Sequence, residues 1–175
     1  MPLYFAYGSN MDIDAMKARC PSSKVVGPAR LARHRFYIMP QGYASVARHP
    51  HGEVHGLLWD LALADIRPLD RYENLAGGLY TKSVQPVLTG AGAKRALIYY
   101  GTSLDQGRPL PGYLENIIRA AETAQLPAAY LRDLKRLLPH GLRQNDQGAP
   151  EPQIDPRAPV ARVRPRFATP FDRRD

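Results

Sequence analysis

The chain of 175 residues has a length typical of one domain, and 44% of its residues are hydrophobic, which excludes wholesale disorder. Its formal net charge is +8, but the basic residues are scattered among apolar and acidic neighbours, so we expect no nucleic-acid partner. No signal peptide begins the sequence, no apolar stretch approaches the ~20 residues that span a bilayer, and Cys20 is the single cysteine, so we expect a cytoplasmic protein without membrane contact.

The N-terminal segment predicts a short buried strand followed by a helix. Residues 3–7 are an apolar and aromatic run that ends at Gly8, which is typical of a strand inside a core. A helix is expected over residues 13–19, with Asn10 or Asp12 as its cap. The strand therefore opens into a short loop that leads directly into a helix.

Two longer segments predict further strands. Residues 25–39 and 44–61 are rich in β-branched, aromatic and glycine residues, so we expect successive strands there. Within the second segment, the sequence His-Pro-His-Gly at residues 49–52 predicts a turn that divides it into a strand pair. Gly56 lies in a strand interior, where a glycine often lets another backbone approach closely.

The following part of the chain predicts one helix, a strand pair and two further helices. Residues 62–73 carry apolar side chains at helical spacing, and residues 80–87 and 95–100 predict a hairpin. Residues 111–124 and 127–138 each begin with proline and predict two helices. Strands that come first and helices that come last favour an α+β domain with a mixed or partly closed sheet.

The last segment has a different composition. Residues 143–175 are rich in proline and arginine with weak periodicity, and we separate them as a C-terminal extension from a domain at residues 1–142. The extension holds seven arginines against five acidic residues, so nucleic-acid binding through it is one alternative, which its deletion would test. If the extension packs on a second subunit, the protein is a homodimer, and the sequence leaves this open.

The loop Tyr7-Gly8-Ser9-Asn10 can carry chemistry. A strand that ends here and begins a helix places several backbone N–H groups in one small concavity, and Gly8 permits close approach. Such a site suits a carboxylate or a developing oxyanion. From spacing alone, an ordinary strand-to-helix turn capped by Asn10 explains the same residues.

Glu73 is the second candidate for a chemical role. It ends a predicted helix, where a carboxylate gains nothing from the helix dipole, so its position suggests another reason. Taken alone, however, an ordinary surface glutamate explains it.

Three motifs, in order along the chain, give these residues a context. Tyr-Phe-Ala-Tyr-Gly-Ser-Asn at residues 4–10 resembles the N-terminal signature of the γ-glutamylcyclotransferase family. Gly-Glu-Val-His-Gly-Leu-Leu-Trp at residues 52–59 is similar to that family's Gly-x-Val-x-Gly-x-x-Trp strand. Leu-Asp-Arg-Tyr-Glu at residues 69–73 matches the family's Leu-Asp-x-x-Glu, and the likeness continues into the helical residues near position 138.

The resemblance implies a fold and a set of site residues. The implied fold is α+β, with a small mixed, β-barrel-like sheet and flanking helices. Glu73 is the implied catalytic acid/base, and neither a cofactor nor a metal is implied. The implied substrate-binding residues are Tyr4, Phe5, Ala6, Tyr7, Gly8, Ser9, Asn10, Tyr80 and Tyr113.

The implied reaction is intramolecular aminolysis of a small γ-glutamyl substrate. Its α-amino group attacks the γ-carbonyl, which gives 5-oxoproline and releases an amine or amino acid. Holding the two reacting groups together supplies much of the acceleration, since effective molarities reach the order of 10⁵ M or more. One glutamate can carry the proton from the amino group to the leaving nitrogen. Because the ordinary glutamate pKa of about 4.3 suits this task poorly, we expect Glu73 to be shielded from water with a raised pKa.

Histidine and cysteine residues receive structural interpretations. His49, His51 and His55 form a His-x-His-x-x-x-His pattern, but zinc needs about four converging ligands, so we expect a histidine-rich turn and no metal. Cys20 has no evident activating partner and is expected to pack in the interior.

Two polar residues inside the motifs have alternative roles. Ser9 lacks the Gly-x-Ser-x-Gly elbow of a serine nucleophile, so its hydroxyl fits substrate binding better. Asp70 is expected to be structural and to pair with Arg67 or Arg71 on the outer face of its helix.

A rival functional class is a catalytically silent protein that keeps the fold and binds a small molecule. Glu73 argues against this class, because a binding protein has no need of an acid/base. The leaving group stays open among γ-glutamyl amino acids, γ-glutamyl amines and γ-glutamyl-protected intermediates. A glutathione-specific activity is disfavoured, because the loop of that branch typically ends in leucine where this chain has Asn10.

Overall fold

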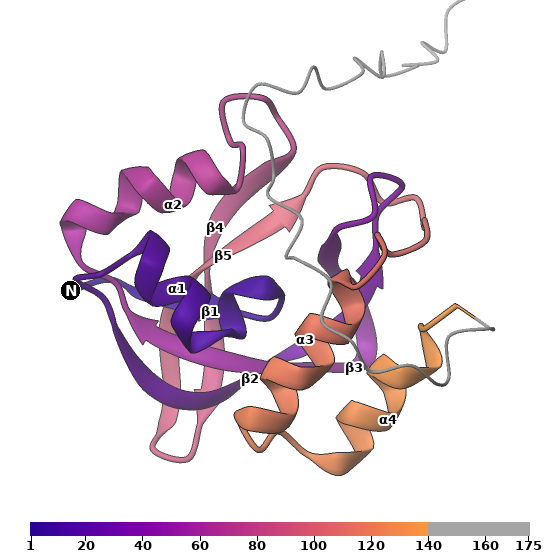
Figure 1. Cartoon of the computed structure of the whole chain (residues 1–175). Coiled ribbons are helices and arrows are strands. Elements are labelled where there is room, and N and C mark those ends of the chain that lie inside the picture. The colour runs from indigo at the N-terminus through magenta and orange to yellow at the C-terminus, as the bar shows by residue number, and fades with distance from the viewer. Residues whose placement is uncertain (140–175) are drawn as a thin grey trace, which may run out of the picture.

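Five strands close into a barrel in the order β1-β3-β2-β4-β5, in a computed structural model that describes residues 1–139 (Figure 1). β1 pairs in parallel with β5 and antiparallel with β3, so the sheet is mixed. The predicted α+β fold with a barrel-like sheet is therefore confirmed. The predicted extension at residues 143–175 lies outside the described residues. The strands are β1 (Leu3–Ala6), β2 (Lys24–Ile38), β3 (Ala44–Asp60), β4 (Tyr80–Thr89) and β5 (Gly92–Gly101).

The helices lie on the outside of the barrel (Figure 1). All four predicted helical segments are confirmed, and Asp12 rather than Asn10 caps the first, because its side chain accepts from the backbone N–H groups of Asp14 and Ala15 at 3.0 and 2.9 Å. The 3₁₀ turns are η1 (Ser9–Met11) and η2 (Leu63–Asp65), and the α-helices are α1 (Ile13–Arg19), α2 (Ile66–Tyr72), α3 (Tyr113–Thr123) and α4 (Ala128–Arg136).

The turn predicted at residues 49–52 is wrong, because β3 runs unbroken through it. Arg48 pairs with His34 and Glu53 pairs with Ala32, so residues 49–52 form a bulge opposite the single residue Arg33. Pro50 has no N–H for the ladder, which explains why this stretch leaves the pairing. The residue types that favour a turn also favour a bulge. The chain reverses its direction earlier, between β2 and β3.

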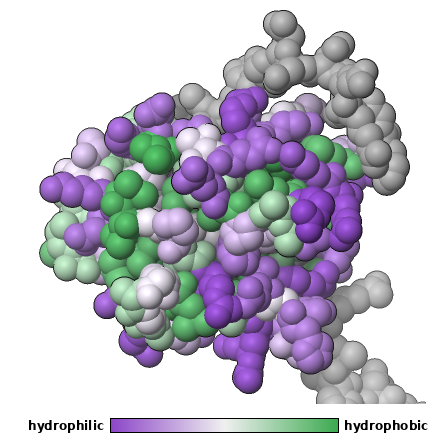
Figure 2. All heavy atoms as spheres, turned by 90° about the horizontal axis from the view of Figure 1, so that it is seen from below, coloured by the Kyte–Doolittle hydropathy of each residue, from purple (hydrophilic) through white to green (hydrophobic). Residues whose placement is uncertain are grey.

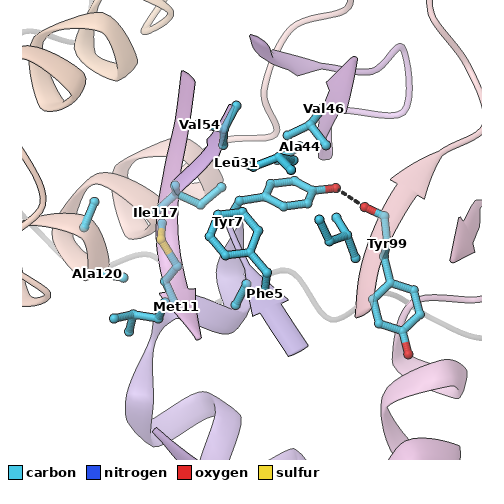
Figure 3. Close-up of a cluster of buried hydrophobic side chains, with 14 of the residues drawn as sticks. Phe5, Tyr7, Met11, Leu31, Ala44, Val46, Val54, Tyr99, Ile117 and Ala120 are labelled. Carbon is cyan, nitrogen blue, oxygen red and sulfur yellow. Dashed lines mark hydrogen bonds between the residues drawn. The ribbon is translucent and has the colours of Figure 1, made fainter. Parts of the chain in front are cut away.

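β1 is a buried strand of the barrel wall, between β3 and β5, and its neighbours come very close. Figure 3 shows Phe5 and Tyr7 among hydrophobic side chains from several elements. Gly56 faces the backbone of β1, and a Cβ atom there would overlap the carbonyl oxygen of Ala6. The close backbone approach predicted at Gly56 is therefore confirmed, and it holds the strand that carries the loop.

α3 supports this loop from the other side. Leu114, Ile117 and Ala121 are fully buried and recur at helical spacing, so one face of the helix is apolar. That face packs on η1, and Tyr113 at the start of the helix reaches the same region.

Over residues 1–139, no helix is long and apolar enough to cross a membrane. On the face seen in Figure 2, hydrophilic side chains interrupt the hydrophobic ones.

Candidate active site

A narrow pocket lies where β1 passes into η1, beside the C-terminal end of α2. Its empty volume is about 330 Å³ with the open mouth included. The lining residues are Tyr4, Tyr7, Gly8, Ser9, Asn10, Tyr72, Glu73, Tyr80, Tyr99 and Tyr113.

Most of the site residues predicted from the sequence meet in this pocket, including Glu73, Tyr80 and Tyr113, which are far from the loop in sequence. Phe5 and Ala6 are the exceptions. Both are fully buried and do not line the pocket, because Phe5 packs into the core and Ala6 lies against Gly56. These two residues hold β1 in the core, and the pocket begins beside them.

Two lining residues, Tyr72 and Tyr99, were not predicted. Tyr72 directly precedes Glu73 and ends α2, so its position in the motif was the available signal. Tyr99 lies on β5, two residues after Leu97, which pairs with Tyr4. The parallel pairing that brings Tyr99 to the site is not visible in the local sequence.

Glu73 is the central ionisable group of the pocket. It caps the C-terminal end of α2 and is only 7% exposed. Burial raises the pKa of its carboxyl group to about 8, while the charge of Arg19 and a hydrogen bond from Asn10 act in the opposite direction, and Asp70 adds to the rise. The shielding and raised pKa expected for Glu73 are therefore present.

Asn10 connects Glu73 to the rest of the loop. Its buried side-chain amide donates one hydrogen bond to Glu73 Oε1 at 2.8 Å and another to the Tyr4 hydroxyl at 2.9 Å. Its oxygen accepts a hydrogen bond from Arg19 at 2.8 Å. Asn10 is thus a polar link within the site, not the helix cap that spacing alone allowed.

Tyrosine hydroxyls fix the walls of the pocket through backbone contacts. Tyr7 donates to the carbonyl oxygen of Tyr99 at 2.6 Å, which Figure 3 shows as a dashed line. Tyr80 donates to the carbonyl oxygen of Ala44 at 2.6 Å, and the N–H of Ala44 donates to Tyr113 at 3.2 Å. Burial raises the pKa of all four tyrosines, so they stay neutral near pH 7 and act through hydrogen bonds.

Asp70 does not have the partners expected from the sequence. Instead of Arg67 or Arg71, it accepts a hydrogen bond from Tyr99 at 2.6 Å and pairs with Lys82 at 2.7 Å. Asp70 therefore faces the barrel strands, and it holds the ring of Tyr99 at the edge of the pocket.

Gly8 leaves one wall of the pocket without a side chain. A Cβ atom on Gly8 would meet the Tyr113 hydroxyl at 3.6 Å, an ordinary contact distance. Ser9 and Asn10 begin η1, so their N–H groups have no partner inside that turn.

A second hollow, which we call the histidine groove, lies between the β3 bulge and α4. Its empty volume is about 1150 Å³, and it is open to solvent. Within residues 1–139, no group of three or more His, Cys, Asp or Glu side chains is placed to hold a metal ion. The groove is lined by His34, Arg35, Phe36, His49, His51, Gly52, Glu53, His55, Pro127, Ala129, Tyr130, Asp133, Leu134 and Leu137.

Cys20 is fully buried at the end of α1, as expected for a packing residue. Burial raises the pKa of its thiol to about 12, so it is not a reactive thiolate near neutral pH.

Comparison with known proteins gives consistent results. The AIG2-like family model matches residues 53–134, which include Glu73, Tyr80 and Tyr113. A gamma-glutamylcyclotransferase from Bos taurus is 30% identical over 149 residues, which cover 79% of this chain and 79% of the relative. The Homo sapiens protein of the same name is 28% identical over the same shares of the two chains.

Comparison with solved structures gives the same result. A solved structure named gamma-glutamyl cyclotransferase superposes with a TM-score of 0.74 at 27% identity, and the match covers 83% of this chain and 93% of that chain.

Proposed function

The chain belongs to the gamma-glutamylcyclotransferase family, and from this premise we propose that it converts a γ-glutamyl amino acid or γ-glutamyl amine to 5-oxoproline and the free amine. The observation that supports the proposal most is the buried Glu73, which lies in a tyrosine-lined pocket and accepts a hydrogen bond from Asn10. An acid/base that is dry and poised near neutral pH is what this reaction needs from the protein.

In the proposed reaction, the α-amino nitrogen forms a bond to the γ-carbon, and the bond from that carbon to the leaving nitrogen breaks. Glu73 takes a proton from the amino group and delivers it to the departing nitrogen. With a pKa of about 8, the carboxyl group is a stronger base than an ordinary glutamate and remains able to return the proton. No covalent intermediate with the protein is needed, because both reacting groups belong to the substrate.

Negative charge that develops on the γ-carbonyl oxygen would be stabilised by the backbone N–H groups at the start of η1. The N–H groups of Ser9 and Asn10 are the candidates, because neither has a partner inside the turn. Gly8 leaves space for the glutamyl group to approach this backbone. Tyr80 and Tyr113, whose hydroxyls are held by Ala44, would contact the substrate from the opposite side.

We further propose that the reaction is independent of metal ions and takes place in the cytoplasm. Proton transfer by Glu73 and charge stabilisation by backbone N–H groups account for both chemical demands of the reaction. The buried thiol of Cys20 suits a reducing compartment, although it does not require one.

The test is to incubate the protein with a panel of γ-glutamyl amino acids, γ-glutamyl amines and γ-glutamyl-lysine isopeptides and to measure 5-oxoproline. We expect product from at least one class, unchanged by a chelator. If no member yields product but one binds in calorimetry, the protein is a silent binding protein and the proposal fails. The panel also identifies the leaving group.

A further inference from the structure

We propose that Arg19 is a positioning residue of the site: its guanidinium group orients the Asn10 amide so that the NH₂ group faces Glu73. Arg19 ends α1, and it is not one of the side chains that line the pocket. It therefore acts through Asn10 rather than on the substrate. Its importance for turnover rests on the proposed function, whereas its effect on Glu73 can be measured without any substrate.

The argument begins with hydrogen-bond chemistry. A guanidinium group has donors and no acceptor, so it can approach only the oxygen of the Asn10 amide, and it does so at 2.8 Å. The amide nitrogen is then directed to the opposite side, where its two hydrogens meet Glu73 and the Tyr4 hydroxyl. Rotation of the amide by a half turn would place its oxygen against the Glu73 carboxylate and its nitrogen against Arg19, and both contacts would be repulsive.

Arg19 is itself held in place by Tyr72. The guanidinium carbon lies 3.8 Å from the centre of the Tyr72 ring, a cation–π contact. The Tyr72 hydroxyl lies 3.0 Å from Ser9 Oγ, which also belongs to the loop. Two consecutive loop residues are thus joined to two consecutive residues at the end of α2, Ser9 to Tyr72 and Asn10 to Glu73. Arg19 contacts one member of each link, Asn10 and Tyr72, and therefore connects the two.

The charge of Arg19 acts in the same direction as the amide. Both the nearby cation and the hydrogen bond from Asn10 lower the pKa of Glu73 against the dominant effect of burial. Asp70 is the charged group that opposes them, and it is paired with Lys82. The pKa values of the Cys20 thiol and of five tyrosines in the pocket are raised, so these groups are neutral near pH 7; the tyrosines are Tyr4, Tyr7, Tyr80, Tyr99 and Tyr113. Arg19 therefore keeps a useful fraction of Glu73 in its basic form.

The experiment compares Arg19→Gln, Arg19→Lys and the control Arg71→Gln, which removes the same charge from an exposed position on α2. For Arg19→Gln we expect kcat near pH 7 to fall by about 10- to 100-fold, with recovery at higher pH because the rising limb of the pH profile moves upward. Arg19→Lys should recover part of the charge effect, and Arg71→Gln should leave both kcat and the profile unchanged. A loss that is equal at all pH values, or none, would overturn the proposal.

A second measurement separates this proposal from the proposed function. The pKa of the Glu73 carboxyl group can be followed by infrared difference spectroscopy, with Glu73→Gln to assign the band. The pKa should be higher in Arg19→Gln than in the natural protein, whether or not a γ-glutamyl compound is turned over. An unchanged pKa would overturn the positioning role, whereas an absence of 5-oxoproline from the natural protein would overturn only the proposed function.

Discussion

The pocket at Glu73 and the histidine groove differ in size and in the environment of their carboxyl groups. The histidine groove has an empty volume of about 1150 Å³ against about 330 Å³ for the pocket at Glu73. The groove is also richer in ionisable side chains. Its carboxylate Glu53, however, is 42% exposed to solvent, pairs with Arg30 and lies 3.5 Å from the ring of His55.

Burial acts on different groups in the two places. In the pocket it raises the pKa of Glu73 to about 8, which puts a carboxyl group near the pH at which it can both take and give a proton. In the groove it lowers the pKa of His34 and His55, which keeps both rings neutral at pH 7. The comparison indicates that burial of an ionisable group, rather than the volume of a hollow, marks the candidate active site.

Removal of the buried Glu73 carboxyl group should have the largest effect on turnover. We expect Glu73→Gln to lower turnover by about 10³-fold or more, because Glu73 is the one carboxyl group among the residues that line the pocket. Folding should be little changed, since the glutamine oxygen can still accept the hydrogen bond from Asn10. Release of 5-oxoproline at saturating substrate and a thermal melt measure the two effects. Residual turnover within tenfold of the natural protein would mean that another group moves the proton.

Two glycines of β3 provide the next comparison, because one lies against the backbone beneath the pocket and the other against the backbone beside the groove. A Cβ atom on Gly56 would overlap the Ala6 carbonyl beneath the pocket, and one on Gly52 would overlap the His34 carbonyl beside the groove. We expect Gly56→Ala and Gly52→Ala each to cost roughly 3–5 kcal/mol of unfolding free energy in urea titrations. Only Gly56→Ala should also reduce kcat of the folded fraction, because it displaces the strand that carries the loop. Equal loss of kcat in both variants would remove the distinction between the two regions.

Much of this arrangement follows from local sequence patterns. The apolar run of β1, the cap at Asp12 and the helical spacing near Glu73 each predict the element that forms. The sequence alone could not show whether residues 49–52 form a bulge or a turn, because proline and glycine are suited to both. The difference depends on which residues of β2 pair with this stretch.

The contacts that the sequence did not predict are made between segments that lie apart in the chain. Tyr99 reaches the pocket through the parallel register of β1 with β5. Asp70 bonds to Lys82 on β4 and Tyr99 on β5, which lie further along the chain. Arg19 is nine residues after Asn10, and only the return of α1 along the loop brings the two side chains together. The family motifs identified Glu73 and the loop, whereas the residues that orient them required the three-dimensional structure.

Stability should also depend on pH in a way that reports the enclosed carboxyl group. The pKa of Glu73 is about 8 in the folded protein, against 4.5 as its ordinary value. Below pH 4.5 the group is protonated in both states and its contribution is fully present. Between pH 4.5 and 8 the unfolded chain releases the proton first, so the free energy of unfolding falls as the pH rises, by roughly 2–3 kcal/mol after allowance for relaxation of the site. Urea unfolding across this window should show a steeper fall in the natural protein than in Glu73→Gln, and parallel curves would contradict the raised pKa.

The smallest effect is expected in the groove, from His55→Gln. His55 contacts the Tyr130 ring, with 5.1 Å between ring centres, and lies 3.5 Å from Glu53. It is the neighbour of Gly56 on β3, but successive side chains of a strand point to opposite faces, so His55 faces the groove while Gly56 faces β1. We therefore expect kcat/KM to stay within about twofold and the loss of stability to stay below about 1 kcal/mol, since a neutral ring is replaced by a neutral amide that can still meet Glu53. Steady-state kinetics across the pH range checks this, with Glu73→Gln as the reference for full loss. A tenfold fall in kcat/KM, or a shifted pH profile, would show that the groove and the pocket are coupled through β3, because the side chain itself lies on the opposite face of the strand.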